Sequence, residues 1–242
     1  MEQQIQIECC WTDSPSAQLK HDFISLANTV FGAFVTESYY QAKFEDNVYG
    51  PSLLCIAYLD GQPVGVDVMW RNDLEKVKAY QTVDTCVLEQ FRGKGLFKKM
   101  TRWELDLLGK DTLVYGFPNE NSYPGYVKMG WHVQRLYKTI CLCMKQGHVD
   151  HEYASWWLKA QSGISYVNKN GKYYLIRKKQ NPVATLIGQV DETTARLFPE
   201  SEAVRLFQCF KTKSSIYNKN KSIPLVCNQI GVEIPYWKID AI

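Results

Sequence analysis

Long apolar runs are missing from this 242-residue chain. No run approaches the roughly 18 consecutive apolar residues that a membrane-spanning helix needs, and the mean hydropathy is −0.30. The first residues, MEQQIQIECCWTDSP, contain no basic segment followed by an apolar one, so we expect no signal peptide. These absences predict a cytoplasmic protein that does not act on a membrane.

Strong charge of one sign is also missing. The formal net charge is +3 at pH 7, with basic and acidic residues interspersed along most of the chain. So mild a charge does not indicate nucleic-acid binding, and we expect no nucleic-acid partner. The one local basic run contains four lysines among polar loop residues, a pattern typical of solvated side chains: Lys211, Lys213, Lys219 and Lys221.

The eight cysteines form no metal-binding pattern. No C-x2-C pair is present, and no His stands at ligand spacing beside a Cys pair, so we expect no metal. Cys55, Cys86, Cys141 and Cys143 lie inside apolar, strand-like runs, where a thiol behaves as a small hydrophobe. We therefore predict reduced thiols and no structural disulfide.

Hydrophobic residues make up 45% of the chain and aromatic residues 13%, enough to bury a substantial core. The first 145 residues alternate between strand and helix patterns. Period-2 runs predict strands over 5–10, 52–59, 64–71, 78–88, 112–116, 132–136 and 139–145. Apolar spacings near 3.6 predict helices over 19–30 (capped by Ser14 or Ser16), 39–46, 96–108 and 122–129.

The pattern changes near residues 147–151, and we place a domain boundary at residue 148. The proposed division is a first domain over 1–148 and a smaller α+β domain over 149–242. In the second domain we expect helices over 152–160 and 191–207. Strands are predicted over 164–168, 173–178 and 183–190, and the second helix leads into a segment over 210–217.

The most informative stretch runs from a strand through a glycine-containing turn into a helix. Gly93 and Gly95 allow positive φ and close approach of a ligand to the backbone. The helix N-terminus directs N–H groups at one point, which suits a phosphate or pyrophosphate. A P-loop is excluded because no Ser or Thr follows a Gly-Lys pair, and a dinucleotide fingerprint because Lys98 replaces its third glycine. The competing interpretation is a simple turn followed by a solvated basic helix face: Lys94, Lys98, Lys99 and Arg102.

Gln90-x-x-Gly93-x-Gly95, placed after a strand, resembles the acetyl-CoA pyrophosphate loop of the GNAT superfamily of N-acetyltransferases. The segment 119–131 is similar to a second motif of that family, N-x2-[AS]-x3-Y-x-K-x-G-[FW]. The order of the predicted elements over residues 1–145 also matches. The resemblance implies an α/β (α+β) fold with a mixed, mostly antiparallel central sheet flanked by helices. It also implies acetyl-CoA as co-substrate.

The resemblance also implies roles for individual residues. Backbone groups of Thr85, Val87 and Leu88 would hold the pantetheine arm. The backbone N–H groups that would take the pyrophosphate belong to six successive residues: Arg92, Gly93, Lys94, Gly95, Leu96 and Phe97.

Tyr126, at the tyrosine of the second motif, is the candidate general acid for the departing thiolate. Asn119 and Ser122 would hydrogen-bond the cofactor or the tetrahedral centre. The competing interpretation of Tyr126 is a core residue beside Trp131.

The general base stays open. Gln81 stands where several relatives have a strand Glu, and an amide is no useful base. Asp84 is the nearest acid, but strand alternation places it opposite Gln81, Thr85 and Val87. In an apolar strand it also needs a partner, an Arg or a backbone donor. Glu120 is the next candidate; a base acting through water and the carboxylate of Ile242 are further alternatives.

Three segments (44–52, 81–84 and 116–119) look like a bacterial GNAT subgroup that accompanies surface-polysaccharide enzymes. The C-terminal part resembles that subgroup's degenerate half-GNAT extension. Our first hypothesis is an N-acetyltransferase in which a small-molecule primary amine, such as an amino sugar or nucleotide amino sugar, attacks acetyl-CoA directly. The rival is an inactive acyl-CoA-binding or interaction module, favoured by the absent strand Glu. A third hypothesis, an RNA-linked acyltransferase, predicts salt-dependent RNA retention. The oligomeric state stays open.

Overall fold

A computed structural model describes residues 5–32, 34–74, 77–141, 147–180, 183–201, 206–211, 222–235 and 237–238. The chain divides into two compact units, each assembled from separate segments. Unit 1 comprises Met1–Gly116, Glu120–His132 and Val226–Ile230; unit 2 comprises Phe117–Asn119, Val133–Leu225 and Gly231–Ile242. A boundary at residue 148 between independent domains stays a prediction.

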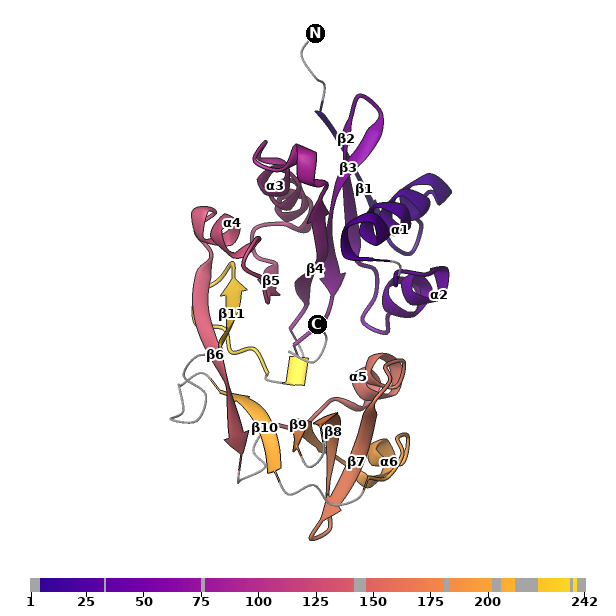
Figure 1. Ribbon diagram of the computed structural model, residues 1–242, viewed down its shortest axis with the longest axis vertical. Coiled ribbons are helices and arrows are strands. Elements are labelled where there is room, and N and C mark those ends of the chain that lie inside the picture. The colour runs from indigo at the N-terminus through magenta and orange to yellow at the C-terminus, as the bar shows by residue number, and fades with distance from the viewer. Residues whose placement is uncertain are drawn as a thin grey trace. The chain divides into compact units, whose positions relative to one another are not determined.

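Unit 1 is built on a sheet of neighbouring strands that follow chain order (Figure 1). Its strands are β1 (Ile5–Trp11), β2 (Leu53–Leu59), β3 (Gln62–Arg71), β4 (Ala79–Val87) and β5 (Leu113–Gly116). The first four pair antiparallel, and β4 and β5 pair parallel. The end of β11 (Ser222–Cys227) adds an antiparallel pair to β5. The expected mixed, mostly antiparallel sheet is confirmed.

Helices cover both faces of this sheet (Figure 1). On one face lie α1 (Ala17–Phe31), α2 (Glu37–Tyr40) and the π-helical turn η1 (Gln41–Glu45); α3 (Leu96–Leu108) lies on the other. Because Trp70 contacts η1 and Asp67 contacts α3, alternate residues of β3 serve opposite faces. The Ser16 hydroxyl caps α1 by accepting from the Leu19 N–H at 3.1 Å, as expected.

The core under α3 and α4 (Tyr123–Lys128) is apolar and aromatic. It contains residues from the central strands, from α4 and the residues that follow it, and from the end of β11: Leu53, Cys55, Met69, Tyr80, Val114, Tyr126, Trp131 and Val226. No helix within the described ranges is long and apolar enough to span a bilayer.

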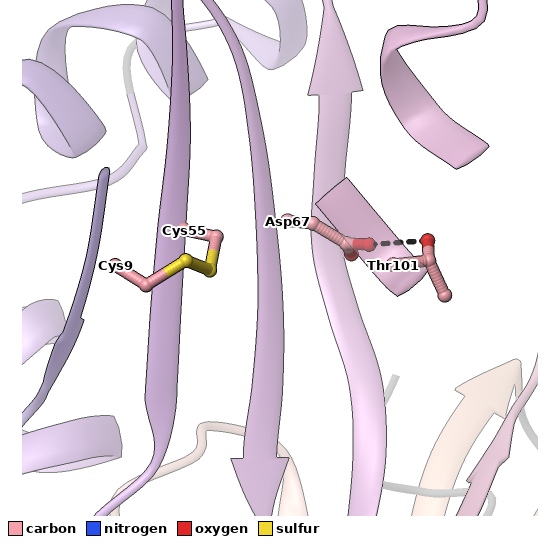
Figure 2. The surroundings of a disulfide bond; sticks show 4 residues. All are labelled: Cys9, Cys55, Asp67 and Thr101. Atoms are coloured by element: carbon pink, nitrogen blue, oxygen red, sulfur yellow. Dashed lines mark hydrogen bonds between the residues drawn. A yellow bond between two sulfur atoms is a disulfide. The ribbon is translucent and has the colours of Figure 1, made fainter. Parts of the chain in front are cut away.

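A disulfide joins Cys9 of β1 to Cys55 of β2 (Figure 2). The two residues are direct cross-strand partners in the antiparallel register, with Cα atoms 4.1 Å apart. Such opposed positions bring two Cβ atoms within bonding reach. The prediction that the chain contains no structural disulfide is therefore wrong, because strand register cannot be read from the apolar character of each run.

Unit 2 contains β6 (His132–Cys141), β7 (Ile164–Lys169), β8 (Lys172–Gln180), β9 (Val183–Val190) and β10 (Leu206–Lys211). β7, β8 and β9 pair antiparallel in succession; β10 pairs parallel to β9 and antiparallel to β6. Its short helices are α5 (His151–Tyr153), the π-helical η3 (Ala154–Leu158) and α6 (Glu192–Ala195).

Two predictions for this region are corrected. One strand, β6, replaces the two expected over 132–136 and 139–145, and residues 142–146 lie outside the described residues. Within the described residues the helix expected over 191–207 is limited to α6, and residues 202–205 lie outside them. Phe207 belongs to β10, where its side chain packs in a strand core with Tyr174 and Ile176. Residues 212–221, which hold three of the four lysines of the basic run, also lie outside the described residues.

Candidate active site

A β-bulge interrupts β4 at its centre. In the β3–β4 register Val66 pairs with Cys86 and Val68 with Val83, so Asp67 faces two residues, Asp84 and Thr85. Asp84 has φ +49°, a left-handed conformation that Asp tolerates better than most residues. One extra residue in the strand shifts the alternation of all side chains beyond it.

The bulge corrects the predicted orientation of Asp84. Asp84 bonds to Lys43 of η1, whereas Thr85 donates to Asp67, which also accepts from Thr101 of α3, so Asp84 and Thr85 lie on opposite faces as expected. Gln81 pairs with Trp70, whose indole N–H donates to the Lys43 carbonyl of η1 at 2.9 Å. Gln81 and Asp84 therefore share one face, and the prediction that they lie on opposite faces is wrong.

Gln81 is buried within its strand. Its side chain accepts a hydrogen bond from the Asn72 amide at 2.9 Å, and the residue is 1% exposed. The Gln81 side chain therefore has a structural hydrogen-bond partner at the position where several relatives carry the glutamate that serves as general base.

Asp84 has the partner that its burial requires, and that partner is a lysine rather than an arginine or a backbone group. Lys43 Nζ lies 2.8 Å from Asp84 Oδ2 and donates to Tyr39 Oη at 2.7 Å; the Tyr39 hydroxyl is 3.3 Å from the same carboxylate oxygen. Lys43 is 3% exposed. Burial lowers the pKa of Lys43, but the Asp84 charge, Tyr39 and their hydrogen bonds outweigh it, so the pKa is raised. Lys43 therefore stays charged at neutral pH.

β4 extends beyond its parallel partner. The pairs with β5 run from Ala79↔Leu113 to Thr82↔Gly116, whereas β4 continues to Val87. No strand in the described part of the chain takes over from β5 along residues 83–87. The two strands pack closely at their last pair, Thr82↔Gly116, since a Cβ on Gly116 would lie 2.1 Å from the Thr82 hydroxyl oxygen. The edge of β4 is thus open where the resemblance places the pantetheine arm.

A glycine loop joins β4 to α3 through the 3-10 turn η2 (Glu89–Phe91). Gly93 and Gly95 have φ +79° and +75°, and a Cβ on either would meet no atom within 4 Å. Glycine is needed there for the backbone conformation, and the space beside it is open. Gly95 is the N-cap of α3 and provides no side-chain hydrogen bond to the N–H groups of the first turn.

Basic side chains surround this helix start. Lys94 is exposed, with Nζ 5.2 Å from the centre of the Phe91 ring, and Lys98, Lys99 and Arg102 are exposed on α3. Together with the positive end of the helix dipole they make this loop favourable for an anion.

Tyr126 is a core residue, and its role as general acid stays a prediction. It is 2% exposed, and its ring packs against Phe97 at 5.0 Å and Trp131 at 4.7 Å. Burial raises the pKa of Tyr126 well above its ordinary value, the charges of Asp67 and Glu104 add to the rise, and hydrogen bonds with the Thr82 and Thr85 side chains oppose it. The ring is thus a core residue while the hydroxyl lies beside β4.

A pair of buried acids near Tyr126 was missed by the sequence analysis. Asp67 of β3 and Glu104 of α3 are both 0% exposed. Asp67 accepts a hydrogen bond from Thr85 Oγ1 at 2.6 Å. It accepts a second one from Thr101 Oγ1 at 2.8 Å (Figure 2). The available signal was an acid inside the apolar run VGVDVMW. The described residues hold no group of three or more His, Cys, Asp or Glu arranged for a metal ion.

The other candidate site residues lie around the start of α4. Glu120 is exposed in the preceding turn, and Ser122 is the N-cap of α4 without a capping hydrogen bond from its side chain. Asn119 is exposed and belongs to unit 2. Ile242 lies outside the described residues.

No protein-family model matches the sequence, and no curated protein sequence matches it. Solved structures do. A GCN5-related N-acetyltransferase from Kribbella flavida superposes with a TM-score of 0.55 over 92% of this chain and 71% of its own, at 9% identity. A conserved protein of unknown function from Enterococcus faecalis, named "Probable N-Acyltransferase", superposes with a TM-score of 0.58 over 93% and 72%, at 13% identity. At such identities the likeness establishes the fold.

Proposed function

Because this chain has the fold of the GCN5-related N-acetyltransferases, we propose that it acetylates a primary amine of a small molecule with acetyl-CoA. One observation carries the proposal: the bulged, open edge of β4 leads directly into the Gly93–Gly95 loop and the uncapped N-terminus of α3. A ligand with an extended arm joined to a pyrophosphate matches this order: the arm lies along the strand edge, and the pyrophosphate lies at the loop and the helix N-terminus.

The residues present fit acetyl-CoA. Both loop glycines leave open space, and the first turn of α3 has N–H groups without a side-chain cap. Thr85, Val87 and Leu88 would hold the pantetheine arm by their backbone groups, and the N–H groups of residues 92–97 the pyrophosphate. Asn119 and Ser122 are assigned by the resemblance to polar contacts with the same ligand. When bound, acetyl-CoA supplies the thioester carbon that the amine attacks.

Tyr126 is the proposed general acid. Its raised pKa keeps the hydroxyl protonated at neutral pH, and a thiolate leaving group gains its proton from such a hydroxyl. The Thr82 and Thr85 side chains of β4 act on the pKa of this hydroxyl, and β4 is the strand that would orient the thioester.

Asp84 and Glu120 are the two carboxylates proposed to serve the amine. The positive charge of Lys43 balances the negative charge of Asp84. Asp84 is therefore better suited to orienting a cationic ammonium through the Tyr39 hydroxyl than to binding it directly. Glu120 is exposed and free of that restraint. Proton removal by water stays an alternative to either carboxylate.

The test is calorimetric titration of the protein with acetyl-CoA, with NADH and ATP as controls, followed by a thiol-release assay with a panel of amines that includes amino sugars. We expect selective binding of acetyl-CoA and amine-dependent release of thiol. No acetyl-CoA binding would show that the loop is only a turn and would end the proposal.

A second candidate, an acyl-CoA-binding module without turnover, is favoured by the buried Gln81 at the position of the family's strand Glu. Tyr126→Phe separates the two. An enzyme should lose on the order of a hundredfold or more in turnover while it keeps its affinity for acetyl-CoA. A binding module shows affinity for acetyl-CoA and no thiol release with any amine, in the wild type as in the variant.

A further inference from the structure

The outer face of α3 presents two large apolar side chains to solvent. Trp103 and Leu107 are 53% and 52% exposed, while the opposite face of the helix buries Leu96 and Met100. Trp103 and Leu107 are one helical turn apart, so their side chains lie next to each other. Single exposed apolar residues are ordinary, whereas adjacent ones on one element are typical of a surface that another protein covers.

Two opposite charges lie beside this apolar pair. Arg102 and Asp106 are exposed and also one turn apart. Among the described residues neither has an ion-pair or side-chain hydrogen-bond partner. Glu192 and Arg196, at the same spacing in unit 2, do form an ion pair. There the acid comes first in the chain, whereas on α3 the base comes first, which is the less favourable order along a helix. Arg102 and Asp106 are therefore available to charges of another molecule.

Helix geometry separates the two pairs into two sides of one exposed face. With 3.6 residues per turn, each residue is rotated by about 100° from the one before it. Trp103 and Leu107 therefore lie on one side of the line that runs along this face, and Arg102 and Asp106 lie on the other. We call these four residues the α3 surface. Its apolar side has no charge, and its charged side reads positive then negative along the chain.

A second copy of the chain, in antiparallel orientation, complements both sides at once. The two-fold axis of such a pair brings each side of the surface against the same side of its partner and reverses the chain direction. When Trp103 stands level with the partner's Leu107, Arg102 is within about 3 Å of the partner's Asp106 along the helix axis. Each of these contacts occurs twice. A parallel pair would place the apolar side against the charged side, so complementarity selects the antiparallel arrangement.

We propose that the α3 surface is a homodimer interface in which two copies of α3 pack antiparallel. In this register the two helices overlap over residues 102–108, about two turns. The first turn of α3 and the Gly93–Gly95 loop lie outside the overlap, so the pairing of the two helices leaves them uncovered. The proposal is independent of the proposed function, because it concerns the opposite face of the helix from the sheet and needs no ligand.

The size of the contact sets its strength. Two turns of helix from each copy bury less area than a standard protein interface, so the dimer is weak and forms with rising concentration. We expect a Kd on the order of 10 to 100 µM. Trp103 contributes the largest apolar side chain and should account for most of the binding energy.

Sedimentation equilibrium of the full chain, without ligand, between about 5 and 500 µM tests the proposal. The wild type should pass from one chain to two across this range. Trp103→Ala should raise Kd by about tenfold or more. Trp11→Ala is the matched control, since Trp11 of β1 is 37% exposed and lies outside the α3 surface. It should dimerise as the wild type does.

An exchange of charges tests the antiparallel register. Arg102→Asp makes the charged side wholly negative, and Asp106→Arg makes it wholly positive. Each variant alone should stay monomeric, because like charges then meet across the two-fold axis. An equimolar mixture should dimerise with a Kd within about threefold of wild type, since opposite charges meet again at both contacts. Urea unfolding serves as the control for folding, and both variants should match the wild type because the two positions are exposed.

Every outcome decides for or against this interface. A wild type that stays monomeric at about 500 µM overturns the proposal and leaves the α3 surface to solvent or to a different protein. A wild-type dimer that survives Trp103→Ala, or that Trp11→Ala weakens equally, moves the interface elsewhere. Two charge variants that stay monomeric when mixed, while the wild type dimerises, overturn the antiparallel register. Should a charge variant fail to fold, the comparison of the two tryptophan variants still decides.

Discussion

Lys43 and Asp84, 41 residues apart in the chain, form a buried ion pair with Nζ 2.8 Å from Oδ2. The lysine comes from the π-helical turn η1, and the aspartate from the left-handed residue of the β4 bulge. The π-helical turn and the bulge are both departures from regular secondary structure, and the ion pair connects them. The pair thereby fixes the orientation of the strand segment that we propose to bind the thioester.

Replacing Lys43 alone should be strongly destabilising. Lys43→Met leaves the Asp84 carboxylate buried without its counter-charge, which typically costs about 3–5 kcal/mol of unfolding free energy. The double variant Lys43→Met with Asp84→Asn removes both charges and should recover part of the loss. Urea unfolding of the wild type, both single variants and the double variant measures the coupling. Equal stability of wild type and Lys43→Met would show that the pair contributes nothing.

Alanine in the glycine loop should weaken acetyl-CoA binding. Gly93→Ala and Gly95→Ala force a Cβ into a positive-φ conformation and into the open space beside the start of α3. Gly61→Ala in the β2–β3 turn is the matched control, since it also has φ +79° and nothing within 4 Å. All three should lose roughly 1–2 kcal/mol of stability through strain.

Calorimetry with acetyl-CoA then separates strain from binding. The two loop variants should bind about tenfold more weakly or worse, a loss of about 1.4 kcal/mol, and Gly61→Ala should bind as the wild type does. Unchanged affinity in both loop variants would remove the loop from the binding site.

The buried Glu104 should make stability depend on pH. Burial raises its pKa well above the ordinary value of 4.5, with the charge of Asp67 and its hydrogen bond to that residue adding to the rise. The folded state therefore binds more protons than the unfolded state above about pH 4.5. Stability is greatest below that pH and falls, by up to about 1.4 kcal/mol per unit, until the pH passes the folded-state pKa.

Glu104→Gln should flatten this fall. Urea unfolding between about pH 5 and pH 9 compares the wild type, Glu104→Gln and Glu152→Gln, an exposed carboxyl of unit 2. The Glu152 variant should follow the wild-type curve. A curve for Glu104→Gln that runs parallel to the wild type would contradict a buried proton at this site.

Reduction of the Cys9–Cys55 disulfide should lower stability. The bond closes a loop with a sequence separation of 46, for which the loss of unfolded-chain entropy corresponds to about 4 kcal/mol. Unfolding with and without a reductant measures the difference. Cys55→Ser should show none, and Cys10→Ser, which alters the neighbouring free thiol, should show the wild-type difference. An identical wild-type transition in both conditions would refute the contribution.

Local patterns predicted most elements of unit 1 closely. The helix expected over 96–108 is α3, because its apolar spacing and flanking glycines are properties of one continuous segment. The β2–β3 hairpin follows from Asp60 and Gly61 between two apolar runs, and both residues have positive φ. The loop motif and Tyr126 were identified by the family resemblance from spacings within one continuous segment, and their roles stay predictions.

The sequence by itself determined the order of the elements and the position of the glycine loop, because both depend on neighbours in the chain. Tertiary structure alone decided the rest, because contacts between distant segments depend on register and packing. The bulge that places Asp84 beside Lys43 requires the pairing of β4 with β3. The disulfide requires the pairing of β1 with β2, and the meeting of Asp67 with Glu104 requires α3 packed on β3. A one-residue change of register in any of these strands would separate such groups onto opposite faces.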